Sequence, residues 1–167
     1  MKRTVNKWLV ILVIGIGVAI LSPSIVLSVS QARYVETSPQ QGGFTIVQGK
    51  DCATIYVDSR DYTGVIRAAR DLQADVARVT SLTPTISHEQ AGLGKNTVII
   101  GTIGKSSIID RLIHDGKVDV TEVAGKWESF LIEVVPEPLP GVANGLIIAG
   151  SDKRGTISIL FGTRIAV

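Results

Sequence analysis

The sequence has a single cysteine, Cys52, so no intramolecular disulfide bond can form. This excludes the small secreted folds that rely on several disulfides for their stability. Cys52 is followed by alternating apolar residues, which predicts a thiol buried in packing rather than a nucleophile. There are only two histidines, His88 and His114, and neither has a second ligand at metal-binding spacing. We therefore expect no metal site.

The sequence also lacks a large excess of either positive or negative charge. The 17 lysines and arginines face 15 aspartates and glutamates. Three of the cations, Lys2, Arg3 and Lys7, precede a long apolar run, and without residues 1–32 the balance is 14 against 15. The folded part is thus nearly neutral and lacks the basic stripe that nucleic-acid binding requires. With 167 residues the chain is also too short for a (β/α)₈ barrel, which needs about 250.

The amino-terminal segment has the order of a secretory signal peptide. Its cations are followed by 14 uncharged residues, Trp8–Leu21, and the small residues of Ser30-Gln31-Ala32 offer a cleavage site after Ala32. The apolar run falls short of the roughly 20 residues that span a bilayer. We expect residues 1–32 to be a signal peptide and the mature chain to be periplasmic or extracellular. The alternative is an uncleaved membrane anchor over residues 8–29.

The rest of the chain is expected to form a polar linker over residues 33–43 and one domain over residues 44–167. Apolar residues recur at intervals of four and three from Val65 to Val79, which predicts an amphipathic helix. Apolar runs between turn residues predict strands at 44–47, 53–57, 85–87, 97–101, 130–135 and 146–149, and helices at 108–113 and after residue 152. The order β β α β β α β β α predicts an α/β fold of the α+β kind: a small mixed-sheet sandwich with helices packed on the sheet.

Local signals also predict how these elements pair and end. The strands at 44–47 and 53–57 are expected to form a hairpin, as are those at 130–135 and 146–149. The polar stretch 58–61 offers a cap for the helix that begins near Val65. Gly116 is expected to end the short helix, and Ser151 or Asp152 to cap the last one.

Three turns lead from a predicted strand into a predicted helix, at residues 58–59, 101–106 and 150–155. Such turns gather at the carboxyl ends of the strands, where α/β proteins usually bind ligands. This edge is therefore the candidate functional surface.

The most distinctive of these turns contains Asp152, Lys153, Arg154 and Gly155. One interpretation is a capped turn in which Gly155 permits close contact between helix and sheet. The other is a turn that docks a second domain or forms the rim of a sugar pocket. The residues alone leave both open.

The second candidate turn contains Gly104, Lys105 and Ser106, which follow a strand as the last residues of a phosphate-binding loop do. Ile99 stands where that loop needs its first glycine, and the interval is too short to wrap a phosphate. We expect a tight strand-to-helix turn.

Paired carboxylates are needed for glycoside hydrolysis, and Glu128, Glu133 and Glu137 lie near one another in the sequence. Glu133 alternates with apolar residues on a predicted strand, however, and Glu137 lies in a proline-rich turn. We expect surface carboxylates and assign no catalytic, cofactor-binding or metal-binding residue.

Four blocks of the sequence, in this order, resemble the N-terminal domain of glycoside hydrolase family 115. The blocks are Thr63–Val76, Val98–Ser106, Gly125–Glu128 and Ala149–Thr156, and the resemblance covers roughly residues 44–157. The family consists of xylan α-1,2-glucuronidases, which remove glucuronic or 4-O-methylglucuronic acid side chains from xylan. It carries its acid/base groups in a (β/α)₈ barrel that follows this domain.

The resemblance implies the N-terminal accessory domain of a secreted hemicellulose-degrading enzyme, with the barrel as its partner and xylan bound through that barrel. Residues 158–167 lack the longer helix and aromatic run that the family has next, so we expect a truncated or frame-shifted chain without activity of its own. The turn at 152–155 would dock the barrel, with apolar surface from Ile157, Ile159 or Leu160. The alternative is a carbohydrate-binding or scaffolding module, free-standing or membrane-anchored.

Overall fold

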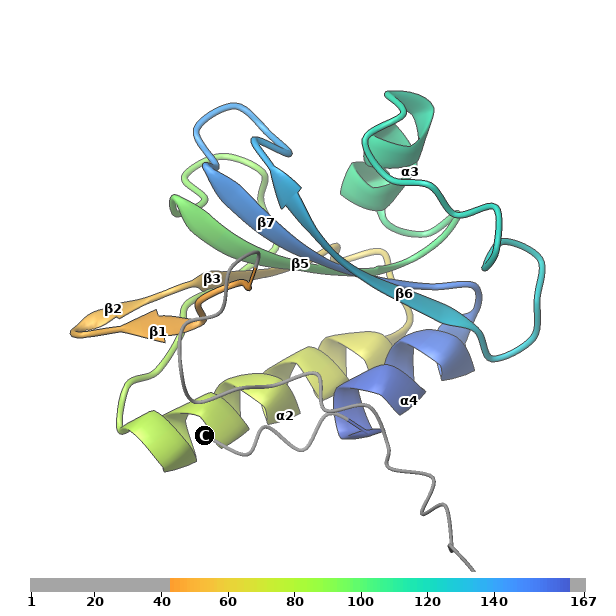
Figure 1. Cartoon of the computed structure of the whole chain (residues 1–167). Coiled ribbons are helices and arrows are strands. Elements are labelled where there is room, and N and C mark those ends of the chain that lie inside the picture. Colours follow the sequence, from red (N-terminus) through yellow and green to blue (C-terminus); the bar gives the residue numbers. More distant parts are fainter. Residues whose placement is uncertain (1–42, 163–167) are drawn as a thin grey trace, which may run out of the picture. The chain divides into compact units, whose positions relative to one another are not determined.

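A five-stranded mixed sheet organises the part of the chain that the structure describes, residues 43–162 of a computed structural model, all within one unit of the chain. Its strand order is β4-β3-β5-β7-β6. The strands β3 (Thr54–Val57), β4 (Ile86–Ser87), β5 (Asn96–Thr102) and β7 (Asn144–Gly150) are parallel, and β6 (Phe130–Pro136) runs antiparallel to β7 at one edge (Figure 1).

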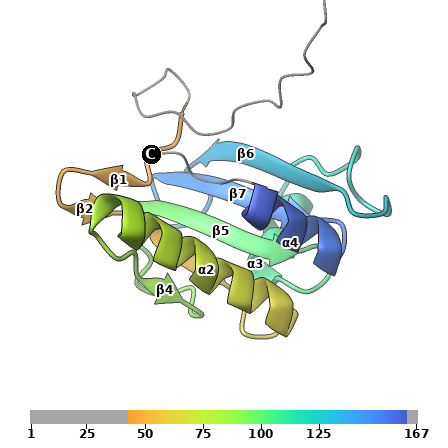
Figure 2. The same cartoon turned by 90° about the horizontal axis from the view of Figure 1, so that it is seen from below.

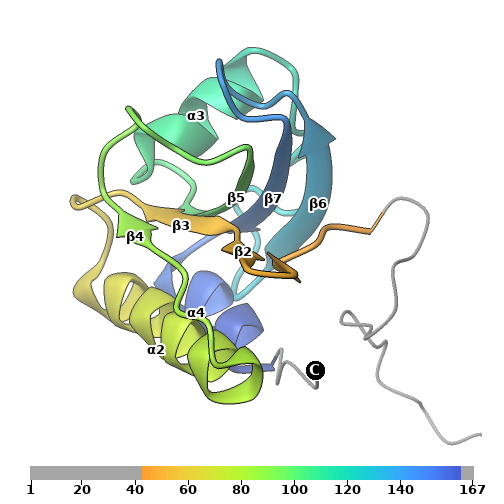
Figure 3. The ribbon, with the colours of Figure 1, turned by 90° about the vertical axis from the view of Figure 1, so that its left-hand side faces the viewer.

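Helices cover both faces of this sheet. The helices α2 (Thr63–Thr80) and α4 (Lys153–Gly162) lie side by side on one face (Figure 2), and α3 (Ser107–His114) lies on the other (Figure 3). Buried strands that face helices on both sides are typically apolar throughout, and β5 is β-branched and uncharged from Thr97 to Ile100. Val98 and Ile100 pack toward α2, and Ile99 toward α3. The predicted mixed sheet with packed helices is confirmed.

The first predicted hairpin is present but shorter and differently composed. Its strands are β1 (Val47–Gln48) and β2 (Asp51–Cys52), which pair antiparallel. The run that we expected to complete this hairpin, 53–57, instead supplies β3 of the main sheet. The prediction that Cys52 is buried is wrong, since it is only half-buried on this small hairpin.

The second predicted hairpin is confirmed. The strands β6 and β7 pair in register from Phe130 with Gly150 to Pro136 with Asn144. The turn between them lies at the amino end of β7, so the loop before β6 lies beside the turn that follows β7.

The helix ends follow the predicted signals in two of three cases. Gly116 has φ +67° and ends α3: its N–H donates to the Ile113 carbonyl, and Lys117 N–H to that of Leu112. Asp152 caps α4, because its Oδ1 accepts from Gly155 N at 2.8 Å. Residues 58–61 do not cap α2, which begins after Tyr62 without a side-chain cap.

The predicted apolar docking surface on α4 is wrong. Ile159 and Leu160 are buried, 3% and 6% exposed, and belong to the core that α2 and α4 form with the sheet. Ile157 is partly buried against the same core. Because α2 lies alongside α4, the apolar face of α4 is covered within the domain.

Other predictions concern residues outside the described range. The signal peptide at 1–32, the linker up to residue 42 and the end of the chain from 163 lie there. Among the described residues, no helix is both long and apolar enough to cross a membrane.

Candidate functional site

The three predicted strand-to-helix turns meet at the carboxyl edge of the sheet. The end of β5 contacts both neighbours: Thr102 N–H donates to Asp61 Oδ2 at 2.7 Å, and Ile103 N–H donates to the Gly150 carbonyl at 2.9 Å. The hydroxyls of Thr102 and Thr156 lie 2.9 Å apart. The turns after β3, β5 and β7 thus form one connected surface.

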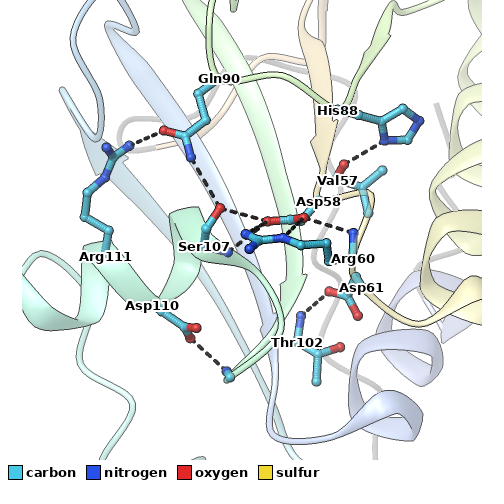
Figure 4. Close-up of polar contacts among 11 residues, drawn as sticks. Val57, Asp58, Arg60, Asp61, His88, Gln90, Thr102, Ser107, Asp110 and Arg111 are labelled. Carbon is cyan, nitrogen blue, oxygen red and sulfur yellow. Dashed lines mark hydrogen bonds and ion pairs between the residues drawn. The ribbon is translucent and has the colours of Figure 1, made fainter.

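Asp58, directly after β3, is the centre of the best-organised polar cluster at this edge (Figure 4). Asp58 is buried, with 4% of the residue exposed. It accepts from Arg60 N, Nε and Nη2 at 3.0, 3.2 and 3.0 Å, and from Ser107 N and Oγ at 3.0 and 2.8 Å. Hydrogen bonds from the Arg60 guanidinium are the largest cause that holds the pKa of Asp58 well below 3.8. Asp58 therefore stays ionised and is a poor proton acceptor.

The Asp58 cluster extends outward from β3 to α3. Ser107 is the first residue of α3, so Asp58 ties that helix to β3. Gln90 Nε2 donates to Ser107 Oγ at 3.3 Å, and Arg111 Nη2 donates to Gln90 Oε1 at 2.9 Å. Figure 4 shows this chain of contacts from Arg111 to Asp58. It fixes the start of α3 from two sides.

An open depression of about 340 Å³ lies beside this cluster. Its lining residues are Arg60, Gly104, Lys105, Ser107 and Asp110. The depression holds two cations and one carboxylate, and Asp58 beneath Arg60 adds a second negative charge. Its charges therefore nearly balance, so it has no strong preference for an anion.

Asp61, four positions from the end of β3, is a second buried carboxylate, 6% exposed. It accepts from Tyr62 N and Thr102 N, both at 2.7 Å. Burial raises its pKa, and these backbone donors partly oppose the rise. Both Asp61 oxygens accept from backbone amides. Asp61 therefore connects the turn after β3 to the end of β5.

The second candidate turn leads into α3. Gly104 N–H donates to Asp110 Oδ1 at 2.8 Å, and the Lys105 ammonium lies 5.3 Å from the centre of the Tyr62 ring. Ser106 is buried, and its hydroxyl has no hydrogen-bond partner. Asp58 and Asp110 already occupy the amides that would have to face a phosphate.

The turn with Asp152, Lys153, Arg154 and Gly155 leads into α4 and is joined to the loop before β6. Asp152 Oδ2 accepts from Glu128 N at 3.0 Å, and Arg154 Nη1 donates to Glu128 Oε1 at 2.9 Å. The Glu128 amide is the largest cause that lowers the pKa of Asp152. Arg154 and Lys153 are exposed. The structure thus brings Glu128 to this turn.

The glycines of this turn are required by close packing. A Cβ at Gly155 would overlap the Ser129 carbonyl oxygen, and one at Gly150 would overlap Thr156. Ser151 N–H also donates to the Ser129 carbonyl, at 2.8 Å. The predicted close contact at Gly155 is thus made with the loop before β6, and the close contact between α4 and the sheet is made at Gly150 and Thr156.

The three glutamates predicted as surface carboxylates are all exposed. Glu128 lies at the turn just described, whereas Glu133 is on β6 and Glu137 in the turn between β6 and β7. In residues 43–162, no group of three or more His, Cys, Asp or Glu side chains is placed to hold a metal ion.

Sequence reasoning missed the central role of Asp58. We interpreted it as part of a cap for the next helix, but it holds a helix that begins 49 residues later. An aspartate at the end of a predicted strand marks a possible edge residue. Nothing in the sequence, however, pairs it with Ser107.

Comparison with known proteins shows the fold. No family model matches the sequence, and neither does any curated protein. A solved structure that it resembles is described as "A novel family GH115 4-O-Methyl-alpha-glucuronidase, BtGH115A, with specificity for decorated arabinogalactans". The match has a TM-score of 0.50 and 24% identity, and covers 66% of this chain but only 12% of that one. The domain described here thus has a fold that also occurs as a small part of a family 115 glycoside hydrolase.

Proposed function

We propose that this chain supplies the N-terminal accessory α/β domain of a secreted xylan α-1,2-glucuronidase-like glycoside hydrolase that acts in hemicellulose breakdown. Its partner would be a catalytic (β/α)₈ barrel, and polysaccharide would bind through that barrel. The solved relative is itself a 4-O-methyl-α-glucuronidase. The shared chemistry would be a (4-O-methyl)glucuronic acid side chain on a polysaccharide.

One observation carries this proposal: the four blocks that resemble family 115 meet in space. The second block ends at the turn after β5, and the first begins with α2, two residues after Asp61, which accepts from Thr102 at the end of β5. The third and fourth meet through the bond from Glu128 to Asp152. Parts of all four blocks thus lie at one edge of the sheet, which is where we propose the contact with the barrel.

The chemistry of the edge favours an accessory role over catalysis by this domain. Hydrolysis of a glycosidic bond needs a protonated acid and a second carboxylate that are free to act on the sugar. Asp58 is ionised and engaged by Arg60 and Ser107, and both oxygens of Asp61 bind backbone amides. Neither carboxylate is available to a substrate.

A domain replacement tests the proposal. The corresponding segment of the solved α-glucuronidase is replaced by residues 44–162 of this chain, and release of glucuronic acid from its own substrate is measured. We expect a soluble chimera with activity close to that of the parent enzyme. The purified chain alone should release no glucuronic acid from glucuronoxylan oligosaccharides.

Two controls accompany this experiment. The same enzyme with the segment deleted should lose solubility or activity, and a chimera with an unrelated α/β domain of similar size should behave like the deletion. A chimera of this chain no better than these controls would count against the proposal. So would turnover by the isolated chain that disappears in Glu128→Gln or Asp152→Asn.

Export is part of the proposal and has its own test. The order of cations, apolar run and small residues predicts cleavage after Ala32. The exported protein should therefore begin at Arg33 on amino-terminal sequencing. A protein that begins at Met1 and sediments with membranes would favour the anchor instead.

The alternative function, a carbohydrate-binding module, is favoured by one observation. Trp127 is 78% exposed in the loop before β6. An exposed indole is a suitable surface for the apolar face of a sugar. An exposed Trp127 is also compatible with an accessory domain.

A further inference from the structure

Trp127 is the most exposed of the large apolar side chains in residues 43–162. Its exposed fraction is 78%, and the next, that of Phe161, is 58%. Burying an indole would stabilise the domain by a few kcal/mol, so its position in solvent contributes little to folding. Such a residue points to a function outside the domain.

The residues after Trp127 are held firmly in place. Glu128 has φ +52°, and its N–H donates to Asp152 Oδ2. Ser129 N–H donates to Ser151 Oγ at 3.1 Å, while Ser151 N–H returns a bond to the Ser129 carbonyl. Gly155 packs against that carbonyl. The loop that carries Trp127 is thus fixed to the turn between β7 and α4, which lowers the entropic cost of binding through it.

Glu128, which follows Trp127 in the chain, belongs to a polar pair that offers both a donor and an acceptor. The Glu128 carboxylate and the Arg154 guanidinium are paired at 2.9 Å and exposed. Lys153 is exposed and has no partner among the described residues. A pyranose presents C–H groups on one face, which pack on an aromatic ring, and hydroxyls around its rim, which bond to such a pair.

We propose that Trp127, Glu128 and Arg154 form a binding platform for a pyranose unit of a uronic-acid-bearing polysaccharide. Lys153 supplies the charge that favours the uronate. The inference rests on the proposed function for its choice of polysaccharide. Of the other exposed apolar side chains, Phe130 begins β6 three residues after Trp127, whereas Tyr62 and Val79 lie at the two ends of α2 and Phe161 lies on α4. Because these side chains are spread over several elements, a sugar fits better than a protein surface. Protein docking uses larger continuous apolar areas.

Affinity electrophoresis of the full chain in gels containing soluble glucuronoxylan tests the platform. We expect Trp127→Ala to weaken binding about tenfold or more and to leave the melting temperature unchanged. The matched control is Phe161→Ala, which removes an exposed aromatic on α4 and should bind like the parent. Lys153→Ala should weaken binding to glucuronoxylan more than binding to xylan stripped of its uronic acid.

Each result of these experiments either supports or refutes the binding platform. A parent chain that does not bind glucuronoxylan, or a Trp127→Ala variant that binds equally well, overturns the platform. If neither binds glucuronoxylan but a separately produced family 115 barrel binds the parent and not Trp127→Ala, the surface docks protein. The platform is then refuted and the proposed function stands. Binding that depends on Trp127, together with an inactive domain chimera, supports the platform and refutes the accessory role.

Discussion

Leu160→Lys is expected to lower the stability of the domain by about 4 kcal/mol or more, because it places an unpaired ammonium in the core. Leu160 is 6% exposed and packs in the cluster that α2 and α4 form with the sheet. The melting temperature should fall by roughly 15 °C, or the protein should be recovered unfolded. Circular dichroism followed during heating measures this.

Phe161→Lys is the matched control, since Phe161 adjoins Leu160 on α4 but is 58% exposed. It should leave the melting temperature close to that of the parent. Leu160→Met, which nearly conserves volume, should cost less than about 1.5 kcal/mol. If Leu160→Lys melts like Phe161→Lys, the core assignment of α4 is wrong and the docking surface predicted from the sequence is restored.

Asp58→Ala is expected to destabilise the domain by about 3 kcal/mol, because it leaves donors from Arg60 and Ser107 without their acceptor. The Ser107 amide belongs to the first turn of α3 and donates to Asp58 Oδ2 at 3.0 Å. The variant should melt roughly 10 °C lower. Amide exchange should become faster in α3 before it does in α2, because the lost contact joins α3 to β3.

The same residue is expected to control stability in acid. The pKa of Asp58 is lowered by folding, so its stabilising contribution is complete above its ordinary value of 3.8 and is lost as the pH falls below it. Burial raises the pKa of Asp61, so protonation at low pH relieves the cost of burying its charge. As the pH falls, its effect on stability is therefore opposite in sign to that of Asp58. The parent should lose stability below about pH 4, and Asp58→Asn should show a flatter acid limb.

Asp119 provides the control for Asp58. It is exposed, its pKa is also lowered, and it bonds only to Thr121, two residues away. Asp119→Ala should melt like the parent and keep the parent's acid limb. If Asp119→Ala and Asp58→Ala have equal effects, the long-range role of Asp58 is refuted.

The sequence predicted the parts of the fold that depend on local pattern. Helix α2 has an apolar stripe at helical spacing, and β5 is a run of β-branched residues, so both are recognisable without partners. Strand β3 was placed in the wrong pairing because 53–57 adjoins the first hairpin in the chain. Its parallel contacts with β4 and β5, about 30 and 40 residues away in the chain, place it in the main sheet.

The sequence predicted where the candidate site lies, but not which of its residues bond to one another. Strand-to-helix turns locate the carboxyl edge for any parallel sheet, and Asp152 carries a recognisable cap. The bonds from Asp58 to Ser107 and from Glu128 to Asp152 join residues 49 and 24 positions apart. No spacing rule connects such residues. The buried face of α4 was missed for the same reason, since α2 covers it.

The packing around Gly150 and Gly155 has a consequence for how the stretch from Gly150 to Thr156 is compared between proteins. Overlap with Thr156 and with the Ser129 carbonyl restricts both positions to glycine, and the helix cap restricts Asp152. A sequence pattern that two proteins share at these positions therefore indicates only that they share this backbone turn. Lys153 and Arg154 are free of such packing restrictions. Whether a relative keeps those two cations is the more informative comparison for what the domain binds.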